Sequence, residues 1–549
     1  MKRAECLVAV CAALLPAFVP VASAAPRADL VPAAQRLYRE GLLADGSALK
    51  GLRQGDNPIE GAAAACINCH RRSGLGNVEG RTRVPPITAK YLFRPRMVNA
   101  ADMETPHLPD FQGNSWAYSD ESLARALREG VKPDGQALSP LMPRYDLPEQ
   151  DMSGLIAYLR QLGEAPSPGV SETELQFATI ITPEADPTSS AAMLEVLRKF
   201  FALEAQQIAA ETRPMKASRE IQYRVTRRWN LHVWQLTGPV GTWQSQLDAY
   251  LAAEPVFAVL AGIGGRHWEP VHRFCEQRQV PCLFPNVDAP VLAEGDFYPI
   301  YYSRGVYLEA DLALHQLQQD STAGQEHRRR LVQVFRAGDV GADGATALAA
   351  KAAAAGWQPV SLSLANGSSA SLGEALKQVR EDDALMLWLR PGDLQNLPSR
   401  PPARSVVVSG TLGGMEAAPL PAAWRELAVE TYPIDLPNLR LARMNYPLFW
   451  FKVQNIKVVD ERTQVDTYLS CVILADILKH MLDSFVPDYL VERYEAMISL
   501  RLANAYYPRL GLAPGQRFAS KGGYLVRWQG AGVVPQGEWT VPGTEGGVP

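Results

Sequence analysis

The sequence has no surplus of positive charge. Its 54 Lys and Arg residues are outnumbered by 58 Asp and Glu residues, which leaves a formal net charge of -4. Nucleic acids and anionic membranes are held mainly by clustered Lys and Arg, so this balance argues against either as the main partner. Hydrophobic residues make up 47% of the 549 positions, a globular composition with room for two or three domains.

Long apolar runs are also lacking beyond the N-terminus, so no later segment is expected to span a bilayer as a helix. The N-terminus joins a short basic start to an apolar run and then to small residues from Ala22 to Ala24. This order predicts a signal peptide over 1–24 that is cleaved near Ala24. Pro16 and Pro20 interrupt the apolar run, which argues against a retained membrane anchor. We therefore expect export to the periplasm and no integral membrane segment after cleavage.

Cysteine is scarce, with seven in the chain, and Cys6 and Cys11 leave with the signal peptide. The remaining five would face an oxidising compartment. Cys275 and Cys282 are predicted on a helix and on the strand after it, and either a disulfide or two free thiols fits that spacing. Cys471 falls on an apolar helix face and is most simply a buried, inert thiol.

The other two cysteines belong to Cys66-Ile67-Asn68-Cys69-His70, a CxxCH motif. Its spacing lets two thiols of one helical turn add to the two vinyl groups of haem, while the next residue presents its imidazole to the iron. A disulfide or a zinc site is the alternative, but the segment lacks the further ligands that zinc needs. We predict one covalent haem c on Cys66 and Cys69, with His70 as an axial ligand.

The second axial ligand should be a methionine or histidine well C-terminal of the motif. The candidates are Met97, Met103, His107 and Met142. Met142 lies in SPLMPRYDLP, an irregular loop between prolines that precedes the closing helix, and we expect it to bind the iron rather than only fill the core. Met152 lies within that helix and is expected to pack.

Residues 25–165 are predicted to form short helices without clear strands. On the segments CINCH, VPPI, SDESLARALREGV, LMPRY and LIAYLRQL, this region resembles the class I cytochrome c family. The resemblance implies an all-α domain in which the carbonyl of Pro85 or Pro86 orients the haem histidine. It also implies that a first helix through Tyr38 and Gly41 crosses the last helix near Tyr158.

Residues 166–174 are polar and rich in turn formers, which predicts a linker. From 175 to 549, apolar β-type runs alternate with helices in two consecutive sets, with crossings near Tyr302 and Tyr432. This rhythm predicts an α/β fold of two doubly wound lobes.

The segments VFAVLAGIGGRHWEPVHRFCEQRQVPCLFPN, YYSRGVYLEADLAL and VFRAGDVGADG make this region similar to type 1 periplasmic binding proteins, the family of branched-chain amino acid receptors of ABC transporters. The resemblance implies a ligand cleft between the lobes. Its loop PEADPTSS departs from the family because it lacks the usual glycine-rich character, and its Asp and Glu disfavour a carboxylate ligand such as an amino acid. The residues at the corresponding loops are Ser189, Ser190, Gly264, Gly265, Asn286, Asp288 and Tyr302.

These features favour an electron-transfer cytochrome fused to a binding-protein-like module. A haem iron held by histidine and methionine suits electron transfer, and a single CxxCH disfavours a dihaem peroxidase. The expected partners are a periplasmic dehydrogenase or another cytochrome. The alternative is a receptor or sensor of a small organic molecule whose haem reports redox state or docks a redox partner. An enzyme is the weakest hypothesis, since no flavin, quinone or further metal motif is present.

Overall fold

The computed structural model describes residues 30–80, 82–94, 116–211, 227–322, 330–365, 370–481, 484–530 and 532–543. The predicted signal peptide lies outside these residues. The chain divides into two compact units, with the boundary between Ala165 and Pro166. None of the helices in the described ranges has the length and apolar character needed to cross a membrane.

Unit 1 combines helices with short strands. Its described helices are α1 (Val31–Glu40), α2 (Ile67–His70), α3 (Ala89–Leu92), α4 (Asp120–Glu129) and α5 (Glu149–Gln161). Its described strands are β1 (Lys50–Arg53), β2 (Asn57–Glu60), β3 (Asn77–Glu79), β4 (Thr82–Val84) and β5 (Arg144–Asp146). They form an antiparallel sheet of order β2-β1-β5 and a separate β3-β4 pair.

The expectation of an all-α domain therefore needs correction. Arg53 pairs with Asn57 across a turn in which Gly55 and Asp56 adopt positive φ, a conformation that Gly and Asp accept readily. The strands are three or four residues long and mostly exposed, so they show no alternating apolar pattern. Turn chemistry, rather than hydrophobic periodicity, is the signal that marks them.

The first and last helices of unit 1 pack together, as the family resemblance implies. The rings of Tyr38 in α1 and Tyr158 in α5 lie 5.3 Å apart. The helices approach closely where Gly154 faces Ala34, since a Cβ on Gly154 would lie 3.6 Å from the Ala34 Cβ. Met152 is buried in the same core. The glycine at this approach is Gly154, whereas Gly41 ends α1 with φ 70°.

The first lobe of unit 2 is a parallel sheet of order β10-β9-β8-β6-β7. Its strands are β6 (Glu174–Ile181), β7 (Arg228–Gln235), β8 (Ala258–Leu260), β9 (Cys282–Leu283) and β10 (Pro299–Ile300). Helices α6 (Pro187–Glu211), α7 (Trp243–Ala253) and α8 (Glu269–Arg278) connect them. In chain order the strands read 2-1-3-4-5, a doubly wound arrangement with its switch point between β6 and β8.

Part of the predicted linker belongs to this lobe. The strand β6 already begins at Glu174, and the Gln176 amide donates to the Gly169 carbonyl at 2.8 Å. Gly169 has φ 69° and packs so closely that a Cβ would lie 2.4 Å from the Phe257 nitrogen. The segment after Gly169 is therefore held against the sheet rather than free in solvent.

The second lobe repeats the same order with two added strands. Its sheet runs β12-β11-β13-β14-β15-β16-β17, and only the last two pairings are antiparallel. The strands are β11 (Arg330–Arg336), β12 (Gln358–Leu364), β13 (Ala384–Trp388), β14 (Ser405–Ser409), β15 (Val429–Tyr432), β16 (Tyr524–Gln529) and β17 (Gly532–Pro535). The helices are α9 (Val306–Thr322), α10 (Gly341–Ala354), α11 (Ala370–Leu376), α12 (Pro391–Leu394), α13 (Gly410–Gly413) and α14 (Ala422–Leu427).

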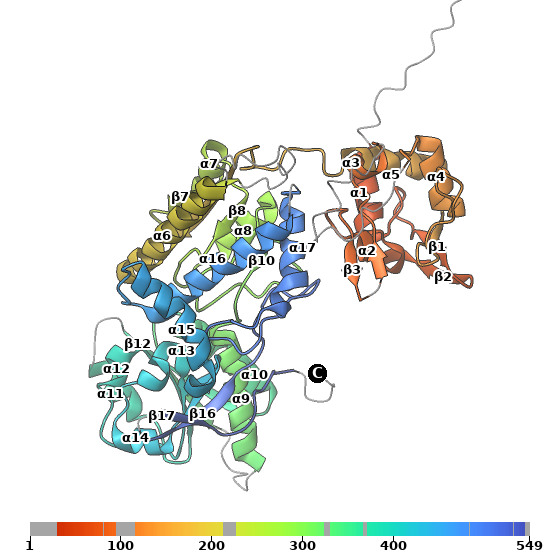
Figure 1. Ribbon diagram of the computed structural model, residues 1–549. Helices are drawn as coiled ribbons and strands as arrows, with labels where there is room; N and C mark the ends of the chain where they lie inside the picture. The colour runs from red at the N-terminus through yellow and green to blue at the C-terminus, as the bar shows by residue number, and fades with distance from the viewer. Residues whose placement is uncertain are drawn as a thin grey trace, which may run out of the picture. The chain divides into compact units, whose positions relative to one another are not determined.

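Three crossings join the lobes. The first follows β10 near Tyr302 and the second follows β15 near Tyr432, as predicted. After the second, α15 (Pro437–Val453), α16 (Glu461–Met481) and α17 (Pro487–Met497) return to the first lobe, and Figure 1 shows α16 and α17 in blue beside the yellow and green elements α6 and α8. The third crossing includes Phe518, which bridges to Tyr301 before β16 re-enters the second lobe. The prediction of two doubly wound lobes is thus confirmed.

Arg517 on the third crossing supports a stability prediction. Its guanidinium is fully buried, pairs with the buried Glu495 and donates to the Phe297 carbonyl at 2.9 Å. Arg517→Met should lower the free energy of unfolding of unit 2 by about 3 kcal/mol, because a buried carboxylate loses its cationic partner. Urea unfolding followed by tryptophan fluorescence measures the loss. Arg404→Met, which breaks an exposed pair with Glu381, should cost less than about 1 kcal/mol, and equal losses would contradict the argument.

Candidate functional site

The CxxCH motif forms one helical turn in unit 1. Cys66 precedes α2, and its carbonyl accepts from the amides of Cys69 at 3.2 Å and of His70 at 3.0 Å. Cys66 and His70 are buried, whereas Cys69 is exposed. Burial raises the pKa of the Cys66 thiol to about 12 because the thiolate is poorly solvated there. The two thiols and the imidazole of the motif therefore project from a single short helix.

The imidazole of His70 is oriented by a backbone carbonyl. Its Nδ1 lies 3.0 Å from the carbonyl oxygen of Pro85, so of the two prolines considered from the sequence, Pro85 is the one that contacts the ring. Burial lowers the pKa of His70 to about 4, and the hydrogen bond to Pro85 opposes this shift. A neutral ring that donates from Nδ1 has the lone pair of Nε2 available for a metal.

The loop after the motif is folded tightly behind the histidine. The Gly76 amide donates to the His70 carbonyl at 3.1 Å, and the Tyr38 hydroxyl donates to the Arg71 carbonyl at 2.7 Å. Gly76 has φ 76°, and a Cβ there would lie 2.1 Å from the Val84 carbonyl oxygen, so only glycine fits. This loop packs against the chain at Val84 and Pro85, and the Pro85 carbonyl faces the imidazole.

Met142 lies in a turn of the same unit. Its amide donates to the Ser139 carbonyl at 3.0 Å, and its side chain is half-buried against the core that also contains Cys66. A thioether on a proline-flanked turn is free of helix or sheet constraints, which suits a metal ligand. The other candidates, Met97, Met103 and His107, lie outside the described residues.

These residues fit a covalently bound haem. The thiols of Cys66 and Cys69 would form the two thioether bonds, and His70 and Met142 would supply nitrogen and sulfur to the iron. The Pro85 contact is the support that a metal-bound histidine needs to keep its tautomer and orientation. The ligand roles of these residues stay predictions.

A large cavity lies between the two lobes of unit 2, with a volume of about 1050 Å³. It opens where strands end at their carboxyl edges in both sheets, the position at which doubly wound folds bind ligands. The first lobe contributes residues after β6, β8 and β9, and the second contributes residues after β11, β13 and β14. The start of α16 and the crossing residue Tyr506 complete the wall.

The structure separates the predicted cleft residues into two groups. Five of them line the cavity, namely Ser189, Gly264, Gly265, Asn286 and Asp288.

The other two, Ser190 and Tyr302, are buried beside it. The Ser190 hydroxyl donates to the Asp186 carbonyl within the first turn of α6. The Tyr302 ring stacks between Phe284 and Tyr507, at centroid distances of 4.2 and 5.0 Å, so it belongs to the core of the crossings.

Sequence reasoning missed the second-lobe wall and the start of α16. Arg390 follows β13, Thr411 follows β14, and Arg440 and Arg462 come from the first turns of α15 and α16. The carboxyl ends of the second-lobe strands were a usable signal for Arg390 and Thr411. The two helix positions had no such signal, because only the fold shows that α15 and α16 return to the cleft.

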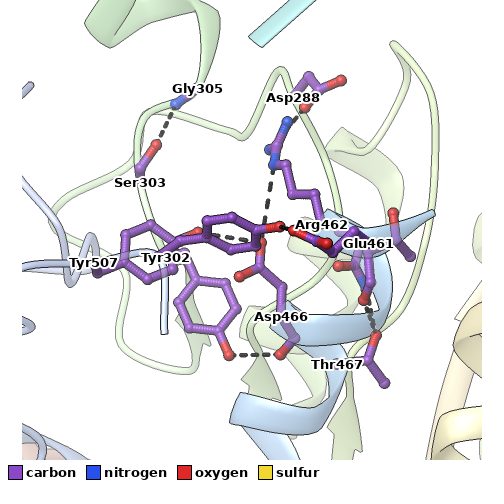
Figure 2. Close-up of polar contacts among 12 residues, drawn as sticks. Asp288, Tyr302, Ser303, Gly305, Glu461, Arg462, Asp466, Thr467 and Tyr507 are labelled. Atoms are coloured by element: carbon purple, nitrogen blue, oxygen red, sulfur yellow. Dashed lines mark hydrogen bonds and ion pairs between the residues drawn. The ribbon is translucent and has the colours of Figure 1, made fainter. Parts of the chain in front are cut away.

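Figure 2 shows Arg462 between two carboxylates at the cavity wall. Its guanidinium lies 3.0 Å from Asp288 and 3.9 Å from Asp466. The backbone carbonyl of Asp466 accepts from the Tyr302 hydroxyl at 2.8 Å, and its side chain accepts from the Tyr507 hydroxyl at 3.2 Å. Burial raises the pKa of Asp466 to about 7, against the opposing effect of Arg462.

Asp466 should therefore make stability depend on pH. Its pKa is raised in the folded state, so stability falls as the pH rises from about 4 to about 7 and stays low above that range. Asp466→Asn removes this penalty and should stabilise unit 2 above pH 7, by up to about 4 kcal/mol, while changing little near pH 4. Denaturant unfolding from pH 4 to 8 tests this, with the exposed Asp382→Asn as the matched control. A stability difference that did not grow with pH would contradict the assignment.

Comparison with known proteins agrees with the motifs of unit 1. A family model for cytochrome c matches residues 60–163, so the chain carries a cytochrome c domain, as the sequence predicts. No curated protein matches the sequence.

Solved structures similar to the chain are substrate-binding proteins, the class that the second region resembles. A fatty acid ABC transporter substrate-binding protein from Thermomonospora curvata is 13% identical over 69% of this chain and 95% of its own, with a TM-score of 0.46. A branched-chain amino acid ABC transporter protein from Thermus thermophilus with bound valine is 11% identical over 68% and 98%, with a TM-score of 0.48. The two-lobed fold described above rests on this chain's own sheets, and no ligand follows from these similarities.

Proposed function

We propose that this protein is a periplasmic monohaem c-type cytochrome that transfers electrons and carries a fused ligand-binding module. The observation that supports it best is the turn Cys66–His70, with two thiols, a buried neutral imidazole and the Pro85 carbonyl at 3.0 Å from Nδ1. A haem c bound there supplies a one-electron carrier. The proposal includes no enzymatic step.

The residues around the motif perform the tasks that such a carrier needs. Pro85 holds the imidazole in one tautomer, and the packed loop behind His70 limits movement of the ring. Met142, in the role proposed for it, would close the sixth position of the iron and leave no site for a substrate there. Outer-sphere electron exchange with a periplasmic dehydrogenase or another cytochrome is then the expected activity.

The second candidate function is a receptor or sensor, in which the inter-lobe cavity holds a small organic molecule and the haem reports redox state or docks a redox partner. The 1050 Å³ cavity at the strand ends of both lobes supports it. Both functions involve the haem and the cavity. Only the receptor or sensor function depends on a ligand bound in the cavity.

The visible absorption spectrum of the purified protein, oxidised and reduced, tests the main proposal. We expect a low-spin c-type spectrum, a methionine-to-iron charge-transfer band in the oxidised form, and no change with carbon monoxide. Ready binding of carbon monoxide would overturn the closed electron-transfer site and favour a sensor or a catalyst. A protein without covalent haem would overturn both functions.

A further inference from the structure

The residues that line the cavity between the lobes favour one chemical class of ligand. This inference rests on the proposed role of the cavity as a binding site. Anionic ligands of such folds are held by free amides at helix N-termini or by unpaired cations. In this cavity both kinds of group are already used by carboxylates of the chain itself.

Two helix N-termini at the cavity, those of α6 and α16, are capped by aspartates. The carboxylate of Asp186 accepts from the Ser189 amide at 2.8 Å at the start of α6. The carboxylate of Asp460 accepts from the Thr463 amide at 3.1 Å at the start of α16. Both aspartates line the cavity, so the positions where an acidic ligand would receive backbone hydrogen bonds already carry negative charge.

The second lobe repeats this pattern. The carboxylate of Asp339 accepts from the Val340 amide at 2.7 Å, just before α10. The amide of Thr411 donates to the buried Glu309 at 2.9 Å. These four amides, two from each side of the cavity, are thus satisfied by carboxylates of the protein.

Every arginine of the described cavity wall also has a carboxylate partner. In all four pairs the nitrogen–oxygen distance is 2.6 to 3.0 Å. The pairs are Arg266 with Asp343, Arg390 with Asp339, Arg440 with Glu416 and Arg462 with Asp288.

Carboxylates remain in excess after this pairing. Glu184, Asp186, Asp460 and Glu461 line the cavity without an arginine or lysine partner among the described residues, and Glu184 contacts the imidazole of His267. Tyr506 is the aromatic residue of the described wall, and the Arg440 guanidinium lies 5.2 Å from its ring centroid, so the ring is not a free stacking platform for a sugar.

We propose that this cavity binds a small organic cation, such as an amine or a quaternary ammonium compound, that has no carboxylate. A cavity of about 1050 Å³ is much larger than a metal ion and suits an organic molecule. The carboxylates that lack an arginine or lysine partner stabilise the positive charge, whereas the aspartate caps and the carboxylate-paired arginines disfavour an anion.

Isothermal titration of the full-length haem protein tests this with putrescine, choline and ethanolamine as cations, and with L-leucine, glutarate and glucose as zwitterionic, anionic and neutral probes. We expect binding of at least one cation, raised thermal stability of unit 2 in its presence, and weaker binding as salt increases. The double variant Glu184→Gln, Glu461→Gln should weaken that binding by about tenfold or more, since two charge contacts are lost. Glu374→Gln, at an exposed position of α11, is the matched control and should not change it.

Each of the other possible results would refute a different part of the proposal. Binding of leucine, glutarate or glucose without any cation would refute the ligand class and leave the cavity as a binding site. Cation binding that the double variant does not weaken would refute the assigned residues. No binding by any probe would refute both the ligand class and the binding role of the cavity, while the haem spectrum, measured separately, would still decide the electron-transfer proposal.

Discussion

Replacing both Cys66 and Cys69 with alanine should abolish covalent attachment of haem to this protein. The two sulfur atoms stand on one helical turn, and the proposed thioether bonds have no other cysteine partner in the described part of unit 1. The mass of the purified variant should lack the contribution of haem. On a denaturing gel its haem stain should fall from complete to undetectable. Either single variant should keep one thioether bond and label weakly.

Matched controls make this outcome specific. Cys275→Ala and Cys471→Ala remove buried thiols of unit 2 and should keep full haem labelling even if they lower its stability. A double variant that kept covalent haem would contradict the assignment of the motif. Loss of labelling in the unit 2 variants as well would point to failed export or folding instead, which the yield of folded protein would reveal.

The α/β region was predictable from the sequence because its central strands are buried on both faces. Runs such as Ala384–Trp388 and residues 406–408 are apolar throughout, and helices of amphipathic or alanine-rich sequence separate the strands of this region. Burial on both faces leaves a strong local signal, so element order and lobe number followed from it.

The edge strand β7 (Arg228–Gln235) lacks the apolar sequence signal of the central strands. It lies at the end of the sheet order and is only partly buried, so its sequence RWNLHVWQ mixes charged, polar and apolar residues. Asn230 and His232 hydrogen-bond to side chains of the neighbouring β6. The sequence analysis did not identify this strand, because pairing with β6 rather than local hydrophobicity stabilises it.

The candidate sites divide in the same way. The haem motif is local, so five consecutive residues predicted its position, and only the choice of Pro85 over Pro86 required the fold. The inter-lobe cavity is built from at least seven separate segments, and a residue such as Arg462 reaches it only because α16 returns to the first lobe. Predicted strand ends indicate which loops lie at the cleft. They do not indicate side chains on helices, such as α16, that return to the cleft from another part of the chain.

Met142→Ala should remove the methionine-to-iron charge-transfer band and lower the reduction potential of the haem. Thioether coordination stabilises reduced iron, so its loss favours the oxidised form and opens the sixth position. We expect carbon monoxide to bind the reduced variant, in contrast to the parent protein. The half-buried position of Met142 against the core makes the cost in folding modest compared with that of a fully buried methionine.

Met152→Ala provides the control, because Met152 is buried in α5 and assigned to packing. It should destabilise unit 1 by about 2 to 5 kcal/mol and leave the spectrum unchanged. If Met142→Ala kept the band while Met152→Ala removed it, the two roles would be reversed. If both variants kept the band, the ligand would be Met97 or Met103. A spectrum typical of two histidine ligands would instead select His107. The absorption spectrum therefore distinguishes the sixth ligand from the methionines that only fill the core.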